Sequence, residues 1–261
     1  MATIKGWFTM NGVHIPIMEG QSKADAASKY INSKHGKTVA KLSSKTTTKK
    51  KENKYTDSYE SIEKAADDYV KDDTKGLQER AYNFYDKLGY TDKPNVINKE
   101  ELERISKTSE FGLLERGYRG ENTQSYIEQF KRGDLYIGEQ RSFGLGTYFG
   151  YGKEAHEIAR GYGEHKESNI LKACITGNTK IITTEQLDKR RDEFMTKAFK
   201  KATDISKTKG AEEAKQYYTK MNKVIMHDDG IFAASLGYDA INVTDAKYIV
   251  VLNRGKVLVS E

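Results

Sequence analysis

The stretch SFGLGTYFGYGKEAHEIARGY, Ser142 to Tyr162, decides how this chain is expected to fold. It opens with a strand-like aromatic run between glycines, GLGTYF, in which glycine commonly marks a bulge or a close backbone approach. The following residues, KEAHEIARGYG, place apolar side chains at helical spacing, and Gly161 and Gly163 are natural helix stops. The stretch therefore predicts a short strand that leads directly into a helix.

A second informative segment lies a short way upstream, LLERGYRG at Leu113 to Gly120. Arg119 offers a rigid fork of donors suited to a ribose or phosphate oxygen. Gly120 lets backbone approach a ligand that a side chain would push away, and Gly144 and Gly146 have the same property. The two segments together predict a binding site made from arginine and close backbone.

Aromatic faces complete this predicted site. Tyr148 and Phe149 end the strand-like run, Tyr162 ends the helix, and a positively charged nicotinamide ring stacks well on tyrosine. Taken singly, an Arg-Gly pair is typical of a turn, GLGTYF of a buried strand, and Tyr162 of a core residue. In this order and spacing they favour a pocket for a flat cationic ring and its pyrophosphate, which points to cleavage of NAD.

Four features follow one another along the chain: YRG (118–120), FKRGDLYIGEQRSFGLGTYF (130–149), a helix ending in Tyr162, and KYIVVLNRGKVLV (247–259). In this order they resemble the ADP-ribosyltransferase superfamily, and are closer to versions encoded by phages and their bacterial hosts than to secreted toxins. The resemblance covers roughly residues 100–261. It implies an α+β fold with a split β-sheet core and transfer of ADP-ribose from NAD to a host macromolecule.

The resemblance also implies roles for single residues. Arg119 corresponds to the arginine or histidine that binds the nicotinamide ribose, Tyr148 to the tyrosine of the G-x-G-x-Y-F version, and Tyr162 to the ring that packs under nicotinamide. Ser142 and Thr147 fall near the Ser-Thr-Ser strand of the family. The residues expected to bind NAD are Arg119, Gly120, Ser142, Gly146, Thr147, Tyr148, Phe149 and Tyr162. The residues expected to act in catalysis are Arg119, Tyr148 and Asp245.

Lys247 is the clear departure from the family pattern. A glutamate is expected at the start of the last core strands, where it steadies the cation-like transition state as nicotinamide leaves, and here the segment reads TDAKYIVV. A lysine has the wrong sign. At about 4 Å and an effective dielectric constant near 20, two positive charges repel by roughly 4 kcal/mol, on the order of a thousandfold in rate.

Three interpretations of this departure stay open. Asp245 lies two residues before Lys247, so on a strand both side chains would share one face about 7 Å apart, and a small shift would bring the carboxylate to the ribose. A carboxylate from another loop is the second option, with these candidates: Glu139, Glu154, Asp228 and Asp229. In the third interpretation the chain is an inactive module that binds NAD, a nucleotide or a protein, as a virion or anti-defence component.

Composition and charge set the wider frame. With 261 residues, 36% hydrophobic and 31% charged, the chain is long enough for one main domain and an appendage. We expect a small element over residues 1–36, a basic flexible linker over 37–54 and the main domain over 55–261. The net charge of +6 makes nucleic acid a second candidate partner beside a protein target, and the residues set no oligomeric state.

Other residue types exclude several classes of protein. The single cysteine, Cys174, allows no internal disulfide and is expected to be a buried, inert thiol in a strand. The histidines show no metal-ligand spacing, so we expect no metal. No apolar stretch has the length of a membrane span and the N-terminus lacks a signal-peptide core, so we expect a cytoplasmic protein, in the host or associated with a virion.

The remaining sequence patterns predict individual elements. Asn11-Gly12 predicts a tight hairpin, and helices are expected over 22–36, 55–71, 76–90 and, capped by Asn98, from 99. The polar stretch 184–221 predicts a helix broken at Gly210. Its apolar stripe, Phe194, Ala198, Phe199 and Ala202, either docks on its own domain or grips a partner. The hinge at 253–255 predicts a terminal hairpin.

Overall fold

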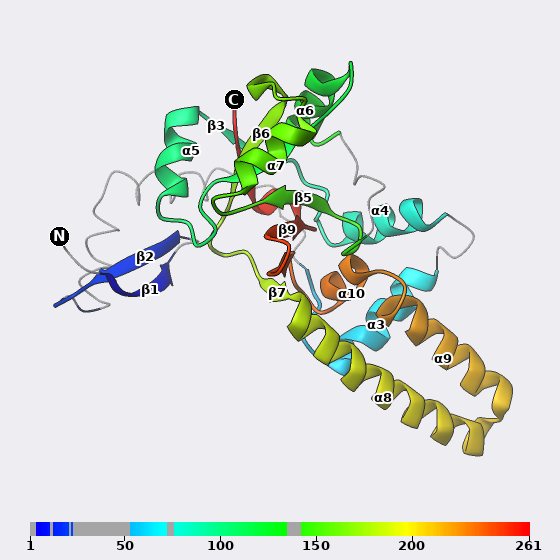
Figure 1. Cartoon of the computed structure of the whole chain (residues 1–261). Coiled ribbons are helices and arrows are strands. Elements are labelled where there is room, and N and C mark those ends of the chain that lie inside the picture. Colours follow the sequence, from blue (N-terminus) through cyan, green and yellow to red (C-terminus); the bar gives the residue numbers. More distant parts are fainter. Residues whose placement is uncertain (1–3, 11–12, 21, 23–52, 72–75, 135–141) are drawn as a thin grey trace.

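The structure is a computed structural model that describes residues 4–10, 13–20, 22, 53–71, 76–134 and 142–261 (Figure 1). The helix predicted over 22–36, nearly all of the linker predicted over 37–54, the Asn11-Gly12 turn and Glu139 lie outside the described residues. Strands β1 (Ile4–Met10) and β2 (Val13–Met18) form an antiparallel pair, which confirms the N-terminal hairpin.

The main body is built on a mixed eight-stranded sheet with the order β3-β10-β6-β4-β5-β9-β8-β7. The pairs β3–β10 and β7–β8 are parallel, and the other neighbours are antiparallel. The strands are β3 (Asn95–Ile97), β4 (Leu114–Gly117), β5 (Thr147–Gly150), β6 (Ile170–Ile175), β7 (Ile181–Thr183), β8 (Ala240–Val243), β9 (Tyr248–Val251) and β10 (Val257–Ser260). Together with the helices, this sheet confirms the predicted α+β class.

The centre of the sheet is a narrow seam. Strands β4 and β5 share a single pair of residues, Glu115 and Gly150, whereas every other neighbouring pair in this sheet shares three or four. Across the seam, Nη1 of Arg116 donates a hydrogen bond to the backbone oxygen of Tyr148 at 3.0 Å. The sheet therefore consists of two four-stranded halves joined at one point.

Helices cover the sheet and follow the predicted periodicity. They are α3 (Tyr59–Val70), α4 (Leu77–Lys87), α5 (Lys99–Ser106), α6 (Thr123–Arg132), α7 (Ala155–Tyr162), α8 (Thr184–Lys209), α9 (Ala211–Ile225) and α10 (Asp229–Ser235), with 3-10 turns η1 (Glu167–Asn169) and η2 (Arg254–Lys256). Asn98 caps α5 as predicted, because its Oδ1 accepts the Glu101 N–H at 2.8 Å. The helices predicted over 55–71 and 76–90 are confirmed with shorter bounds.

The two faces of the sheet belong to different apolar cores. Phe149 and Ile249 pack into one core with Phe130 of α6, whereas Tyr148 and Val250, their neighbours along β5 and β9, contact the other. This second core is formed mainly by helices α3, α4, α8, α9 and α10. The alternation follows from the two-residue period of a strand. As predicted, Cys174 is buried in a strand. It packs against α5, and burial raises the pKa of its thiol to about 12.

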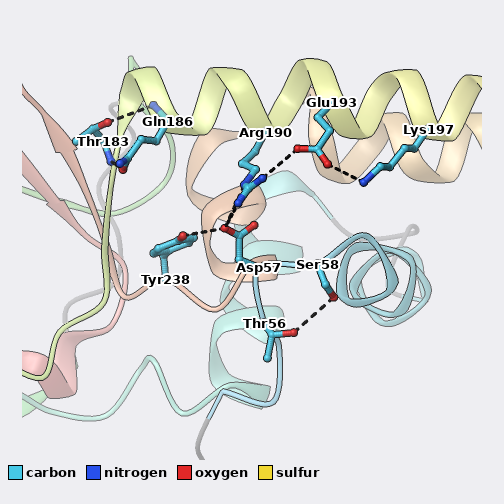
Figure 2. A network of polar contacts seen from close by, with 9 residues as sticks. All are labelled: Thr56, Asp57, Ser58, Thr183, Gln186, Arg190, Glu193, Lys197 and Tyr238. Carbon is cyan, nitrogen blue, oxygen red and sulfur yellow. Dashed lines mark hydrogen bonds and ion pairs between the residues drawn. The ribbon is translucent and has the colours of Figure 1, made fainter.

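Helices α8 and α9 form a hairpin that extends from the sheet, and α9 packs along α3 (Figure 1). Figure 2 shows the contact at its base, where Asp57 accepts hydrogen bonds from Arg190 at 2.9 and 3.1 Å and from the Tyr238 hydroxyl at 3.1 Å. The break at Gly210 is confirmed. The predicted apolar stripe is partly wrong, because Phe199 lies on the outer side, 66% exposed, next to Tyr218.

The predicted terminal hairpin is also wrong. Strand β9 pairs with β5 and β8, whereas β10 pairs with β6 and β3 in the other half of the sheet. The segment Asn253–Gly255 does turn, with the Asn253 side chain accepting the Gly255 N–H at 3.1 Å. The Asn253 side-chain nitrogen Nδ2 donates to Asp239 at 2.7 Å. The Arg254 N–H donates to the backbone oxygen of Tyr90 at 3.0 Å. These contacts carry the chain across to the other half of the sheet.

Candidate functional site

Helix α7 lies directly on the end of strand β4. A Cβ atom added to Gly117 would be 2.0 Å from the Ala159 oxygen and 2.9 Å from the Tyr162 Cβ, so the backbones meet without a side chain between them. The strand direction continues after Gly117, where the Tyr118 N–H donates to the Asn169 oxygen at 2.9 Å. This close approach brings Tyr162, which is 48% exposed, to the end of β4.

Arg119 and Gly120 follow β4 at the same place. Gly120 has a φ of +94°, and a Cβ there would meet no heavy atom within 4 Å, so the space beside its backbone is open. The Gly120 N–H donates to Oε1 of Glu164 at 3.1 Å, two residues beyond Tyr162. Arg119 is exposed and lies two residues beyond Gly117, next to Gly120. The structure thus places the Arg119–Gly120 backbone just beyond the contact between β4 and the end of α7.

Tyr148 is held on β5 by its own loop. Its hydroxyl donates to the Gly144 oxygen at 2.7 Å and accepts the Phe143 N–H at 3.0 Å. Burial raises the pKa of Tyr148 to about 12, so it is a neutral phenol whose hydroxyl is already engaged. Its ring lies edge to face with Tyr248, with the centroids 6.5 Å apart.

Tyr248 contacts the predicted Tyr148 and was not foreseen from the sequence. It is half-buried at the start of β9, opposite Gly150 of β5. Its pKa is raised by burial and, to a smaller extent, by the nearby Tyr162. Tyr148 and Tyr248 therefore form a pair of rings on the neighbouring strands β5 and β9. The only sequence signal was the proximity of Tyr248 to the departure at Lys247.

Arg116 is a second residue that sequence reasoning missed. Its guanidinium donates a hydrogen bond to the backbone oxygen of Tyr148 across the seam and lies 4.9 Å from the centroid of the Tyr118 ring. Its Nε atom is buried and has no hydrogen-bond partner among the described residues. Two arginines thus flank Tyr118, with Arg116 turned into the seam and Arg119 exposed.

Several residues of the predicted site are engaged in packing. A Cβ on Gly146 would lie 2.6 Å from Cγ1 of Val250, and one on Gly144 would lie 2.2 Å from the Gly230 nitrogen, so both glycines permit close packing of the protein on itself. Phe149 is fully buried against Phe130, with the ring centroids 6.0 Å apart. Thr147 is also buried, whereas Ser142 is exposed. The side chains of Phe149 and Thr147 face the interior.

Asp245 does not lie on a strand as expected. Residues Thr244–Lys247 form the turn between β8 and β9, and both Asp245 and Lys247 are exposed. Lys247 has a φ of +55°, and its Nζ lies 6.0 Å from the centroid of the Tyr151 ring. The prediction that Asp245 and Lys247 lie on one face of a strand is therefore wrong. Both residues belong to a turn, in which side chains do not alternate as they do in a strand.

Two of the alternative carboxylates are committed to other contacts. Asp228 is buried, accepts the Leu145 N–H at 3.0 Å and the Ile231 N–H at 3.0 Å, and so caps α10. Burial raises its pKa despite these hydrogen bonds. Asp229 forms an ion pair with Arg191 of α8. Glu154 is exposed immediately before α7.

A cluster of charged side chains around the buried Glu115 contacts α7. Glu115 of β4 is 6% exposed and contacts Nδ1 of His156 at 2.9 Å and Nζ of Lys172 at 3.6 Å. The other ring nitrogen of His156 lies 3.3 Å from Glu167. The cluster joins α7, β4, β6 and η1. No motif in the sequence indicated it, because its members are distant along the chain.

Two hollows of the surface lie elsewhere. One of about 300 Å³ is lined by residues that include Phe111, Thr176, Thr183 and Asn242, and one of about 880 Å³ by residues that include Lys93, Val96 and Glu128. Neither hollow is lined by Arg119, Tyr148 or Tyr162.

The described part of the chain contains neither a metal-binding cluster nor a membrane-spanning helix. No group of three or more histidine, cysteine, aspartate or glutamate side chains there is arranged to hold a metal ion. Among the same residues, no helix combines the length and the apolar character that crossing a bilayer requires.

Comparison of the chain with protein-family models, with curated proteins and with solved structures finds no match.

Proposed function

We propose that this chain is an NAD-dependent mono-ADP-ribosyltransferase that transfers ADP-ribose to a macromolecule, with a protein as the first candidate acceptor and nucleic acid as the second. The observation that supports the proposal is the contact of α7 with Gly117, which places Tyr162 at the end of β4, with the Gly120 N–H bonded to Glu164 just beyond α7. Tyr248 and Tyr148 form an edge-to-face pair on the neighbouring strands β9 and β5. The narrow seam agrees with the split sheet that the sequence resemblance implies.

The exposed groups suit the parts of NAD. The half-exposed Tyr162 ring offers a face for the cationic nicotinamide. The Arg119 guanidinium forms no ion pair with another described residue, so it is available for a ribose hydroxyl or a phosphate. The open space beside Gly120 admits a ligand close to the backbone.

The proposed reaction breaks the bond between the nicotinamide nitrogen and the ribose. The bonding electrons leave with neutral nicotinamide, and the ribose carbon gains cationic character until a nucleophile on the acceptor attacks it. The protein contributes by holding the leaving ring against tyrosine and the rest of the dinucleotide on Arg119. Such fixed positioning is a general source of catalysis.

Binding and turnover of NAD test the proposal. Calorimetry should show that the wild-type chain binds NAD and that Arg119→Ala and Tyr162→Ala weaken binding at least tenfold. Arg132→Ala is the matched control, because Arg132 is an exposed arginine of α6 that pairs with Asp134. Incubation with labelled NAD and cell lysate should give nicotinamide release and transferred label. Absence of both binding and release from the wild-type chain would refute the proposal.

The second candidate function is an inactive module that binds NAD or a nucleotide without cleaving it. Lys247 favours it, because this lysine stands in the turn before β9, where the family resemblance led us to expect a glutamate. This candidate predicts calorimetric binding of NAD with no nicotinamide release from any variant, including Lys247→Glu.

A further inference from the structure

The smaller of the two surface hollows lies on the face of the sheet that carries Phe149 and Ile249. Its floor is the parallel pair β7–β8, in which Thr183 lies opposite Asn242. Partners on neighbouring strands share a face, and the strands are about 4.8 Å apart. Ile181, two residues before Thr183, lies on the same face. The floor is therefore apolar at one end and able to form hydrogen bonds at the other.

Asn242 brings an amide with an unused donor to this floor. It is half-buried on an interior strand, between Thr183 of β7 and Ile249 of β9, although asparagine is uncommon in strands. Its Oδ1 accepts the Tyr151 hydroxyl at 2.9 Å, which fixes the orientation of the amide. Its Nδ2 has no hydrogen-bond partner among the described residues. This nitrogen is therefore available to a ligand in the hollow.

An aromatic ring forms part of the wall. Phe111, half-buried in the loop between α5 and β4, lines the hollow and lies edge to face with Tyr151, with the ring centroids 5.2 Å apart. Ile175 at the end of β6 adds a second apolar side chain. Tyr151 thus contacts both the ring and the amide of the hollow. A ring held in this way offers a flat surface on which another flat ring stacks.

Charge and size restrict the ligand. Of the described residues that line the hollow, Glu110 is the only one with a charged side chain. A phosphate or carboxylate group would be repelled by this acid and would find no cation there. The volume of about 300 Å³ is at the lower end of the range of ligand pockets. The hollow therefore suits a small, uncharged, flat ring with a polar edge.

We infer that this hollow binds a pyrimidine base, either of a free nucleoside or of a single nucleic-acid strand whose phosphates stay outside. The base stacks on Phe111, and a carbonyl oxygen on its edge accepts a hydrogen bond from Nδ2 of Asn242. The Thr183 hydroxyl is a second donor, because it accepts the Gln186 N–H at 3.1 Å and keeps its own hydrogen (Figure 2).

Uridine is the first probe, because it is small, uncharged and not a part of NAD. Its Kd is measured by NMR titration, and that of a single-stranded oligouridylate by fluorescence anisotropy. Phe111→Leu keeps an apolar side chain and removes the flat ring, so it should weaken binding at least about fivefold, the lower end of the effect of losing a stacked base. Asn242→Asp keeps the acceptor for Tyr151 and removes the donor, and it should weaken binding by a similar factor.

Asn222→Asp is the matched control. It makes the same change at a half-buried asparagine of α9 that does not line the hollow, and it should leave the Kd unchanged. Thermal unfolding shows whether each variant is folded. If Asn242→Asp unfolds, Phe111→Leu still tests the inference, because Phe111 lies outside the strands of the sheet.

The outcomes also separate this inference from the proposed function, on which it does not rest. Binding of uridine that depends on Phe111 and Asn242 supports a nucleoside site, and the same dependence with the oligouridylate alone supports a strand site. Binding of neither probe, binding unchanged in both variants, or binding of methyl glucoside in place of uridine overturns the inference. Loss of uridine binding in Arg119→Ala also overturns it, because the base would then occupy the proposed NAD site.

Discussion

Replacing Gly117 with alanine tests the contact on which the proposed site depends. The new Cβ would lie 2.0 Å from the Ala159 oxygen and 2.8 Å from the Gly163 nitrogen, both backbone atoms that no side-chain rotation can move away. To restore an ordinary contact of 3.4 Å, α7 must shift by about 1.4 Å. The shift would move Tyr162 and separate α7 from β4 at their point of contact.

The size of the effect follows from two opposing contributions. Overpacking of this kind costs about 1–3 kcal/mol, and the rigid partners place Gly117→Ala near the upper end. Alanine also restricts the unfolded chain, which returns about 0.4–1 kcal/mol. The net destabilisation is about 2 kcal/mol, and since a domain of this size loses roughly 2–4 °C per kcal/mol, the melting temperature should fall by about 4–8 °C.

The matched control is Gly161→Ala in the same helix. A Cβ on the exposed Gly161 would meet nothing within 4 Å, and alanine in a helix is favoured over glycine by about 0.5–1 kcal/mol, so this variant should be more stable than the wild type. Thermal unfolding followed by circular dichroism, with urea titration as a second measure, compares the two. Equal stability of Gly117→Ala and Gly161→Ala would refute the close approach of α7 to β4.

Three other predictions concern stability. Asp228→Ala should cost about 2 kcal/mol in urea unfolding, because it removes the α10 cap and the acceptor for Leu145, and an unchanged midpoint would contradict that role. Glu115→Ala should cost about 1–2 kcal/mol, because it removes a buried carboxylate that bonds to His156 and Lys172, which are partly exposed and keep Glu167 as a partner. The exposed Glu167→Ala should cost less than about 1 kcal/mol, and similar losses in both variants would contradict a larger role for Glu115. Burial raises the pKa of Tyr148 to about 12, and a tyrosine of the unfolded chain ionises near pH 10, so its contribution is complete below about pH 10 and is lost as pH rises toward 12. Urea titrations at stepped pH should show this fall, and Tyr148→Phe should lessen it; a pH dependence identical in the two proteins would count against the assignment.

Local sequence signals predicted the helices well. The period of the apolar residues places α3, α4 and α5, the Asn98 side chain marks the start of α5, and Gly210 separates α8 from α9. These features depend on residues within a few positions of one another, so they are visible in the chain alone. The side of α8 on which Phe199 lies was predicted wrongly, because the position of α9 decides it.

The candidate site was predictable only in part. Arg119, Tyr148 and Tyr162 stand out by motif and spacing, and the contact of α7 with Gly117 places Tyr162 at the end of β4. Tyr248 and Glu164 could not be selected from the sequence, since each gains its position from a contact with a distant segment. Asp245 was assigned to a strand because alternation was assumed to continue through residues that form a turn.

The amino-acid sequence by itself determined the α+β class, most of the helices and the order of the arginine, glycine and tyrosine motifs, because these follow from local periodicity and residue type. Only the tertiary structure decided that the terminal strands part into opposite halves of the sheet, that α7 lies on Gly117, and that Glu164 reaches Gly120. The physical reason is that hydrogen bonds between strands and contacts between backbones join residues far apart in the chain, and no local pattern specifies their partners.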